Sequence, residues 1–176
     1  MGKREERGIT LVETAVVVAV TAIVASSAVP SFRSLIEKQR LDGVAAQLAT
    51  DIQFARAEAV LRNAGVRLTL QTRAWGSCYV IHTGNANQCS CSETGAAQCS
   101  DGAQQIKTVQ LPASEQVAVQ GNVGSILFDS LHGTSTPTGT LKLVAASGGA
   151  VHHVVNVMGR VRTCSPAPAV SGYSVC

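Results

Sequence analysis

An apolar run from Ile9 to Val29 constrains this chain most, because its only ionisable side chain is Glu13. About 20 apolar residues, at about 1.5 Å each, cross the hydrocarbon core of a bilayer as a helix. The leader before the run, 1–8, contains three basic residues, and such residues favour the cytoplasmic side of a membrane. A single membrane-spanning helix is therefore predicted, with the rest of the chain outside the cytoplasm.

Two simpler interpretations of this run leave features unexplained. A secretory signal peptide has a shorter apolar core of about 7 to 15 residues, although the small residues at 25–28 resemble its cleavage site. A plain membrane anchor does not explain Glu13, since a carboxylate within hydrocarbon costs about 2.5 to 3.5 kcal/mol. Glu13 is therefore expected to have a partner.

The junction Gly8-Ile9-Thr10-Leu11-Val12-Glu13 resembles the processing signal of type IV prepilins. The resemblance implies that prepilin peptidase cleaves after Gly8, that the new amine of Ile9 is methylated, and that 9–29 joins the helical core of a filament. Glu13 would pair with the terminal amine of a neighbouring subunit, which relieves the cost of burying its charge and fixes the register. Pro30 lies where pilins commonly carry a helix-kinking proline.

An amphipathic continuation of the helix is predicted after Pro30, because apolar residues recur mostly at spacings of three and four. These residues are Phe32, Leu35, Ile36, Leu41, Val44, Leu48, Ile52, Ala55, Ala59 and Val60. Asn63-Ala64-Gly65 is a helix stop signal. The helix end Phe54-Ala55-Arg56-Ala57-Glu58-Ala59-Val60, followed directly by a strand pattern, resembles the GspH/FimT pseudopilins.

Beyond the helix, the apolar period changes from about 3.6 residues to two, which predicts short antiparallel strands packed on the helix. The expected strands are 66–71, 78–82, 106–111, 116–120, 140–144 and 151–157. The predicted fold class is α+β, and the resemblance implies a type IV pilin-like fold. The expected organisation is a leader at 1–8, a membrane and filament-core helix at 9–29, and a periplasmic domain at 30–176 that includes the amphipathic part of the helix.

Six cysteines all follow the apolar run, where an oxidising compartment lets them form up to three disulfides. Cys164 and Cys176 are expected to pair, because they bracket a tail rich in Pro, Ser and Gly. The other four, Cys78, Cys89, Cys91 and Cys99, would hold a polar, Gly-rich loop that is expected to be irregular. Zinc binding by Cys89, Cys91 and Cys99 is the alternative, but their spacing departs from the usual pairs.

Composition and motifs exclude the commonest enzyme classes. The formal charge is +3, and loss of three basic and two acidic leader residues lowers it by one, so gross charge indicates no nucleic-acid partner. No GxSxG, GxGxxG, Walker or HExxH pattern is present, and no catalytic site, cofactor or metal is expected. Asp129, Ser130 and His132 are too close in sequence for a triad and indicate a turn. His152 and His153 should face opposite sides of a strand, one buried and one solvated.

The segment Gly159-Arg160-Val161-Arg162 is the one candidate binding site. If it is extended, both arginines share a face and Val161 turns inward, and two guanidiniums side by side suit phosphate oxygens. The competing interpretation is a solvated strand edge whose charges discourage aggregation. Spacing alone favours the strand edge.

A second resemblance changes that balance. GRxR near the C-terminus is similar to the DNA-binding element of FimT-type minor pilins, which help type IV pili to capture DNA in natural transformation. It implies DNA contact by Gly159, Arg160 and Arg162. Because few phosphates would be neutralised and few aromatic residues lie among these basic residues, binding to double-stranded DNA is expected to be weak and to show little sequence preference. Further candidate contacts are Lys107, Lys142, Arg67 and Arg73.

The predicted function is therefore a DNA-binding minor pilin, held in the bacterial inner membrane and then assembled with other pilins. The alternatives are a GspH-type minor pseudopilin of a type II secretion system and a priming minor pilin without a ligand.

Overall fold

The structure is a computed structural model that describes residues 10–176, without the side chains of 27–31. The predicted processing site, Gly8 and Ile9, lies outside the described residues, as does the side chain of Pro30. Contacts divide the chain into two compact units, the first ending at Ile36 and the second running from Glu37 to Cys176. We call the second unit the globular domain.

Helix α1 (Leu11–Arg62) begins in the first unit. Thr10 caps it, because the backbone N–H of Glu13 donates to Thr10 Oγ1 at 3.3 Å. Large apolar side chains of this unit, such as Val12 and Ile23, are exposed. Within the described residues, no helix is long and apolar enough to cross a membrane. The predicted spanning segment, 9–29, extends past the described side chains at both ends.

One stripe of α1 is fully buried in the globular domain. Its residues follow one another at alternating spacings of four and three: Leu41, Ala45, Leu48, Ile52, Ala55 and Ala59. This confirms the predicted amphipathic face from Leu41 onward. The expectation for Val60 was wrong, since its side chain is half exposed, and Ala45 was not predicted. Phe32, Leu35 and Ile36 are exposed and precede the globular domain.

The helix ends at the predicted stop signal. Asn63 adopts a left-handed φ of 49°, and two backbone bonds close the end, from Asn63 N to Val60 O and from Ala64 N to Ala59 O, both at 3.2 Å. This pair of bonds is the Schellman arrangement. Asn63, rather than Gly65, takes the left-handed position, so the chain turns back directly into the first strand.

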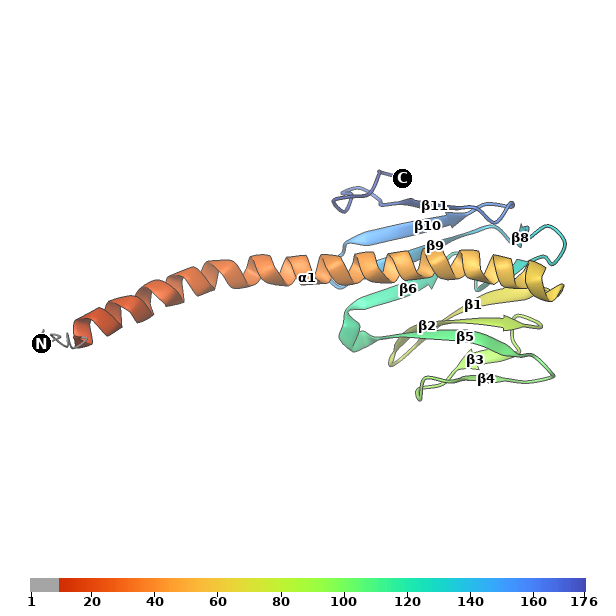
Figure 1. Cartoon of the computed structure of the whole chain (residues 1–176), viewed down its shortest axis with the longest axis horizontal. Helices are drawn as coiled ribbons and strands as arrows, with labels where there is room; N and C mark the ends of the chain where they lie inside the picture. Colours follow the sequence, from red (N-terminus) through yellow and green to blue (C-terminus); the bar gives the residue numbers. More distant parts are fainter. Residues whose placement is uncertain (1–9) are drawn as a thin grey trace, which may run out of the picture. The chain divides into compact units, whose positions relative to one another are not determined.

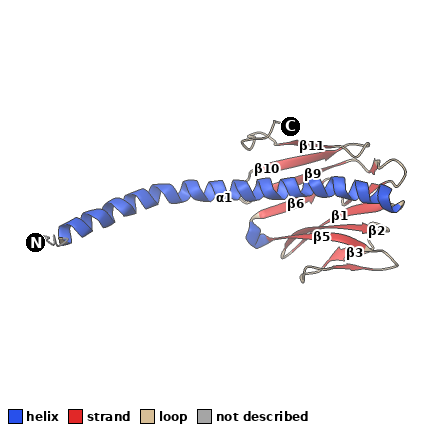
Figure 2. Ribbon diagram, in the orientation of Figure 1, coloured by secondary structure: helices blue, strands red, loops and turns tan. Residues whose placement is uncertain are grey.

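Two antiparallel sheets pack on the helix (Figures 1 and 2). The five-stranded sheet has the order β5-β2-β1-β7-β8, and its strands are β1 (Val66–Arg73), β2 (Gly76–Thr83), β5 (Gln105–Pro112), β7 (Ser125–Phe128) and β8 (Ser135–Thr136). The four-stranded sheet has the order β11-β10-β9-β6, and its strands are β6 (Val117–Gly121), β9 (Gly139–Ala145), β10 (Ala150–Val155) and β11 (Val161–Cys164). A short 3₁₀ turn, η1 (Ala113–Glu115), connects β5 to β6. The predicted α+β class and the six predicted strands are confirmed, except that the strand expected at 151–157 ends at Val155 and its last two residues lie in a turn. Strands β7, β8 and β11 were not predicted.

The loop between β2 and β5 is more ordered than the sequence indicated. It contains a two-stranded sheet of β3 (Cys89–Cys91) and β4 (Ala97–Cys99). Disulfides join Cys78 to Cys91 and Cys89 to Cys99. The buried sulfurs pack with Val80 and, at the edge, with Trp75. The prediction of an irregular loop was wrong. The two disulfides form the centre of a small apolar cluster, which the polar composition of the loop did not indicate.

The third disulfide joins Cys164 to Cys176, as predicted from the tail's composition. Zinc binding by Cys89, Cys91 and Cys99 is excluded, since all three sulfurs are already in disulfides.

The main core lies between the helix stripe and both sheets, and among the residues that the structure describes its first member is Leu41. Tyr79, Phe128 and Leu143 are among its largest buried side chains. The buried hydroxyl Ser77 Oγ accepts from Val119 N at 2.8 Å, which joins β2 of one sheet to β6 of the other. The globular domain therefore has a complete core of its own, as a domain that folds independently requires.

Candidate nucleic-acid interface

The predicted GRVR segment lies at the turn between β10 and β11, and Asn156 organises that turn. Gly159 N donates to Asn156 O at 2.8 Å, and Asn156 N donates to Arg160 O at 3.1 Å. The side chain of Asn156 also accepts from Arg160 N at 3.0 Å. Gly159 has a φ of +69°, which L side chains rarely adopt. The first arginine therefore follows a turn that backbone bonds hold in one conformation.

The same turn rests on the end of helix α1. Gln53 Nε2 donates to Gly159 O at 3.3 Å, and Arg56 Nε donates to Gly133 O at 3.0 Å. A Cβ at Gly159 would lie 2.8 Å from Gly133 O and 2.9 Å from Arg56 Cδ. The two sequence fragments that resemble the GspH/FimT proteins, the helix end and the GRxR segment, are thus in contact.

Gly159 was predicted to contact DNA, but it is buried against Arg56 and Gly133. Its role in the structure is to allow the left-handed turn and the close approach of two backbones. It supports the arginines from behind and is not part of the exposed surface.

Arg160 and Arg162 are both exposed, and Val161 between them is half-buried against the core. Arg162 lies on β11, opposite Val154 of β10, and β11 is the edge strand of its sheet. Among the described residues, neither arginine side chain makes a hydrogen bond or an ion pair. The predicted alternation, with two guanidiniums outward and Val161 inward, is what the structure contains.

The strands of the four-stranded sheet contain basic residues and no acidic ones. From Ser130 to Cys176 the chain has no Asp or Glu. On β9 and β10, Lys142 lies opposite His152, on the same outer face as Arg162. Strand spacing and rise place the Cα atoms of Lys142 and Arg162 about 12 Å apart. Burial, with a contribution from the Lys142 charge, holds the pKa of His152 below its usual value, so Lys142 and the arginines carry the charge at neutral pH.

Three further basic candidates lie away from this face. Lys107 of β5 forms an ion pair with Asp51 at 2.6 Å, and Asp51 Oδ2 accepts from the Tyr79 hydroxyl at 2.8 Å. Burial, reinforced by Asp51, raises the pKa of Tyr79. Lys107 therefore ties the helix to β5, on the other sheet. Arg67 and Arg73 lie on β1 of that sheet. Of the four further basic candidates, Lys142 alone therefore shares the outer face of the four-stranded sheet with Arg162, which we call the GRVR face.

The histidines have structural environments. His153 is buried: Nε2 donates to Ala45 O at 2.9 Å, and Nδ1 lies 2.9 Å from Thr163 Oγ1. Burial lowers the pKa of His153, so its ring is neutral and fully bonded. His152 is partly exposed on the opposite face, as predicted.

The segment 129–133 forms the predicted turn. Asp129 Oδ2 accepts from Leu131 N at 3.0 Å and from His132 N at 2.9 Å. The bond from His132 N is the largest cause that lowers the pKa of Asp129. These contacts are those of an Asx turn and give Asp129 a structural role.

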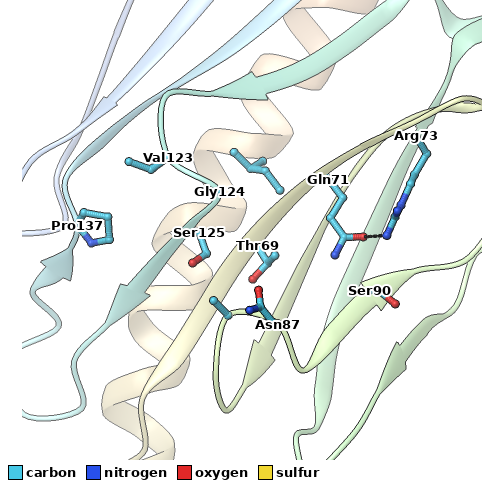
Figure 3. A pocket seen from close by; sticks show the side chains of 11 residues that line it. Thr69, Gln71, Arg73, Asn87, Ser90, Val123, Gly124, Ser125 and Pro137 are labelled. Carbon is cyan, nitrogen blue, oxygen red and sulfur yellow. Dashed lines mark hydrogen bonds between the residues drawn. The ribbon is translucent and has the colours of Figure 1, made fainter.

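A second candidate surface is an open cleft of about 680 Å³ on the outer face of the five-stranded sheet (Figure 3). Its polar lining residues are Thr69, Gln71, Arg73, Asn87, Ser90 and Ser125. Arg73, the only charged one, donates to Gln71 Oε1 at 3.2 Å. Thr69 is bonded to the buried ring of His82 at 2.8 Å. The cleft thus offers a polyanion less unpaired positive charge than the GRVR face.

The fold places the chain among the type IV pilin-like proteins, in which the C-terminal part of a long helix packs on antiparallel sheet. The type IV minor pilin FimU of Pseudomonas aeruginosa (strain PAO1) matches with a TM-score of 0.54 and 18% identity, over 74% of this chain and 96% of its own. The minor pseudopilin EpsH from the Type 2 Secretion System of Vibrio cholerae matches with a TM-score of 0.51 and 12% identity, over 73% of this chain and 98% of its own. At such identities the likeness shows the fold alone.

Sequence comparison gives the family. Residues 44–159 match the family described as Type II transport protein GspH. The Pilin-like protein PilA1 of Thermus thermophilus is 32% identical over 159 residues, which are 89% of this chain and 97% of its own. The chain belongs to the GspH family, as the helix end indicated. The family match ends at Gly159, so Arg160 and Arg162 follow its last residue.

Proposed function

We propose that this chain is a minor pilin of a type IV pilus that binds DNA through phosphate contacts by Arg160 and Arg162, in the service of natural transformation. The observation that carries the proposal is the pair of exposed arginines, without a partner among the described residues, on a sheet that contains no acidic residue. Guanidiniums bind phosphate oxygens bidentately and remain charged at any physiological pH.

The processing and assembly steps belong to the same proposal. Prepilin peptidase cleaves after Gly8, the apolar segment 9–29 holds the subunit in the inner membrane, and Glu13 pairs with the methylated amine of Ile9 in a neighbouring subunit. The exposed valines of the first unit support this, since such apolar surface requires a covering of lipid or of other helices. Other pilins are therefore its partners in the filament.

The expected affinity is modest. Two to four neutralised phosphates give a slope of about −2 to −4 for log K against log salt concentration, and a micromolar or weaker affinity. Phosphate contacts carry no sequence information, so sequence preference should be weak. Several subunits on one filament would raise the effective affinity for long DNA.

The test is a titration of a fluorescent DNA duplex with the full chain in detergent, followed by fluorescence anisotropy. Arg160→Ala and Arg162→Ala should each weaken binding and reduce the salt slope by about one. Arg73→Ala is the matched control, because it removes the same charge from the other sheet. If Arg160→Ala and Arg162→Ala both bind DNA as tightly as the wild type does, the proposal is wrong.

A second candidate function is a minor pseudopilin of a type II secretion system, favoured by the family's description. Deletion of the gene distinguishes the two candidates. Loss of transformation with normal protein secretion supports the DNA-uptake function, whereas loss of secretion with normal transformation supports the pseudopilin.

A further inference from the structure

The turn that precedes the arginines has an apolar tip. Val157 and Met158 are 55% and 52% exposed, and Leu131 of the adjacent turn is 74% exposed. The two turns are joined, because Ser135 N donates to Val157 O at 2.8 Å and Ser135 Oγ donates to Asn156 O at 2.6 Å. We call Leu131, Val157 and Met158 the apolar tip.

The apolar tip is held from behind. Arg56 bonds to Gly133, which ends one turn, and Gln53 bonds to Gly159, which ends the other. These contacts occupy the inner side of both turns, and the three tip side chains remain outside. Their exposure therefore does not come from loose packing of the turns.

Phosphate binding alone gives no reason for large apolar side chains beside Arg160. Contiguous exposed apolar groups generally mark a contact surface. DNA-binding proteins insert such residues, Leu and Met among them, against sugars and base steps of a groove, while arginines bind the flanking phosphates.

We propose that Val157 and Met158 enter a groove of duplex DNA and contact deoxyribose and base edges, while Arg160 and Arg162 bind the phosphates at its rim. This inference rests on the proposed DNA-binding function. It adds a contact whose strength does not depend on salt, since burial of apolar surface releases no counterions.

Charge favours DNA over a protein as the occupant of the tip. Arg160 is two residues from Met158, and no acidic residue follows Asp129. Asp129 is the one carboxylate of the adjacent turn, and it accepts from the turn's own Leu131 N and His132 N. Within the two turns, a polyanion that approaches the tip therefore meets one carboxylate, which is already hydrogen-bonded.

The experiment measures duplex affinity of the full chain in detergent at several salt concentrations, for Val157→Ser, Met158→Ser and Arg160→Ala. Each tip variant should bind about fivefold more weakly at every salt concentration, from the loss of about half a side chain's burial. The salt slope should not change in the tip variants, whereas Arg160→Ala should reduce it by about one. Val175→Ser is the control, because Val175 is 67% exposed in the C-terminal tail.

Heparin separates groove contact from charge, because it is a polyanion without bases or a duplex groove. The tip variants should bind heparin as the wild type does, and Arg160→Ala should bind it more weakly. An unchanged melting temperature shows that each variant is folded, as expected for exposed positions.

The outcomes distinguish the two claims. If the arginine variants weaken duplex binding and the tip variants do not, the groove contact is wrong and the proposed function stands. If neither set has an effect, the proposed function itself fails. If the tip variants bind DNA normally but are not incorporated into filaments, the tip is an interface between pilins, which also overturns the inference.

Discussion

Gly159→Ala tests the contact between the end of helix α1 and the turn that joins β10 to β11. Two separate costs are expected. A side chain at a φ of +69° costs about 1 to 2 kcal/mol. The new Cβ would also lie 2.8 Å from Gly133 O and 2.9 Å from Arg56 Cδ, and overpacking of this kind costs about 1 to 3 kcal/mol. The free energy of unfolding should therefore fall by about 2 to 5 kcal/mol.

Gly102→Ala is the matched control for this substitution. Its φ of +76° is close to that of Gly159, but nothing lies within 4 Å of a Cβ built there. Gly102→Ala should cost only the conformational part, about 1 to 2 kcal/mol. The difference between the two variants measures the crowding alone.

Urea denaturation of the globular domain, followed by circular dichroism, measures both losses. Arg56→Ala in the Gly159→Ala background should recover part of the loss, since it removes one of the two crowded neighbours. If Gly159→Ala and Gly102→Ala destabilise the domain equally, the close approach of Gly159 to Gly133 and Arg56 is not the reason for this glycine.

Three further outcomes are expected. Burial lowers the folded-state pKa of His153 below its unfolded value of about 6.5. The free energy of unfolding should therefore decline as the pH falls below 6.5, by up to about 1.4 kcal/mol per pH unit. His153→Gln should reduce this decline in thermal unfolding between pH 5 and 7.5, and equal slopes for the two proteins would contradict the prediction. The Cys164→Ser/Cys176→Ser double variant should lose about 3 kcal/mol in urea denaturation, and an unchanged midpoint would show that backbone bonds alone hold the tail. Lys107→Met should lower the free energy of unfolding by about 1 to 3 kcal/mol, because it leaves the buried carboxylate of Asp51 without its ion pair, although the 39% exposure of Lys107 limits the loss. DNA affinity should not change, and weaker DNA binding would show that Lys107 contacts DNA.

Local sequence pattern accounts for much of the globular domain. The stripe from Leu41 to Ala59 and the six predicted strands follow from periodicity, because burial of one face imposes that period. Asn63 ends the helix because its side chain tolerates a left-handed conformation. The pairing of Cys164 with Cys176 follows from a tail that has little other means of attachment.

Contacts between residues far apart in the chain could not be predicted. Lys107 pairs with Asp51 across 56 positions, and Arg56 reaches Gly133 across 77. No local pattern encodes such distances. Strands β7 and β8 are short, and a strand of so few residues has too few positions to show an alternation of apolar and polar side chains. The ordered β3–β4 insertion depends on disulfide connectivity, which spacing does not determine.

The geometry of the candidate interface was predicted in part. The outward arginines and inward Val161 follow from strand alternation, but the turn at Asn156 and the burial of Gly159 depend on the helix behind them. One signal in the sequence was missed: the absence of acidic residues after Asp129. That absence leaves the four-stranded sheet with Lys142 and Arg162 and without an acidic side chain on its strands.

Titration of the isotopically labelled globular domain with a short DNA duplex, followed by heteronuclear NMR, tests the central claim most directly. We expect the amide shifts to concentrate from Val157 to Cys164, with weaker shifts at Lys142, and to diminish in Arg160→Ala. Shifts confined to the cleft around Thr69 and Arg73, or to the exposed face of the helix, would contradict the claim that the β10–β11 hairpin binds DNA.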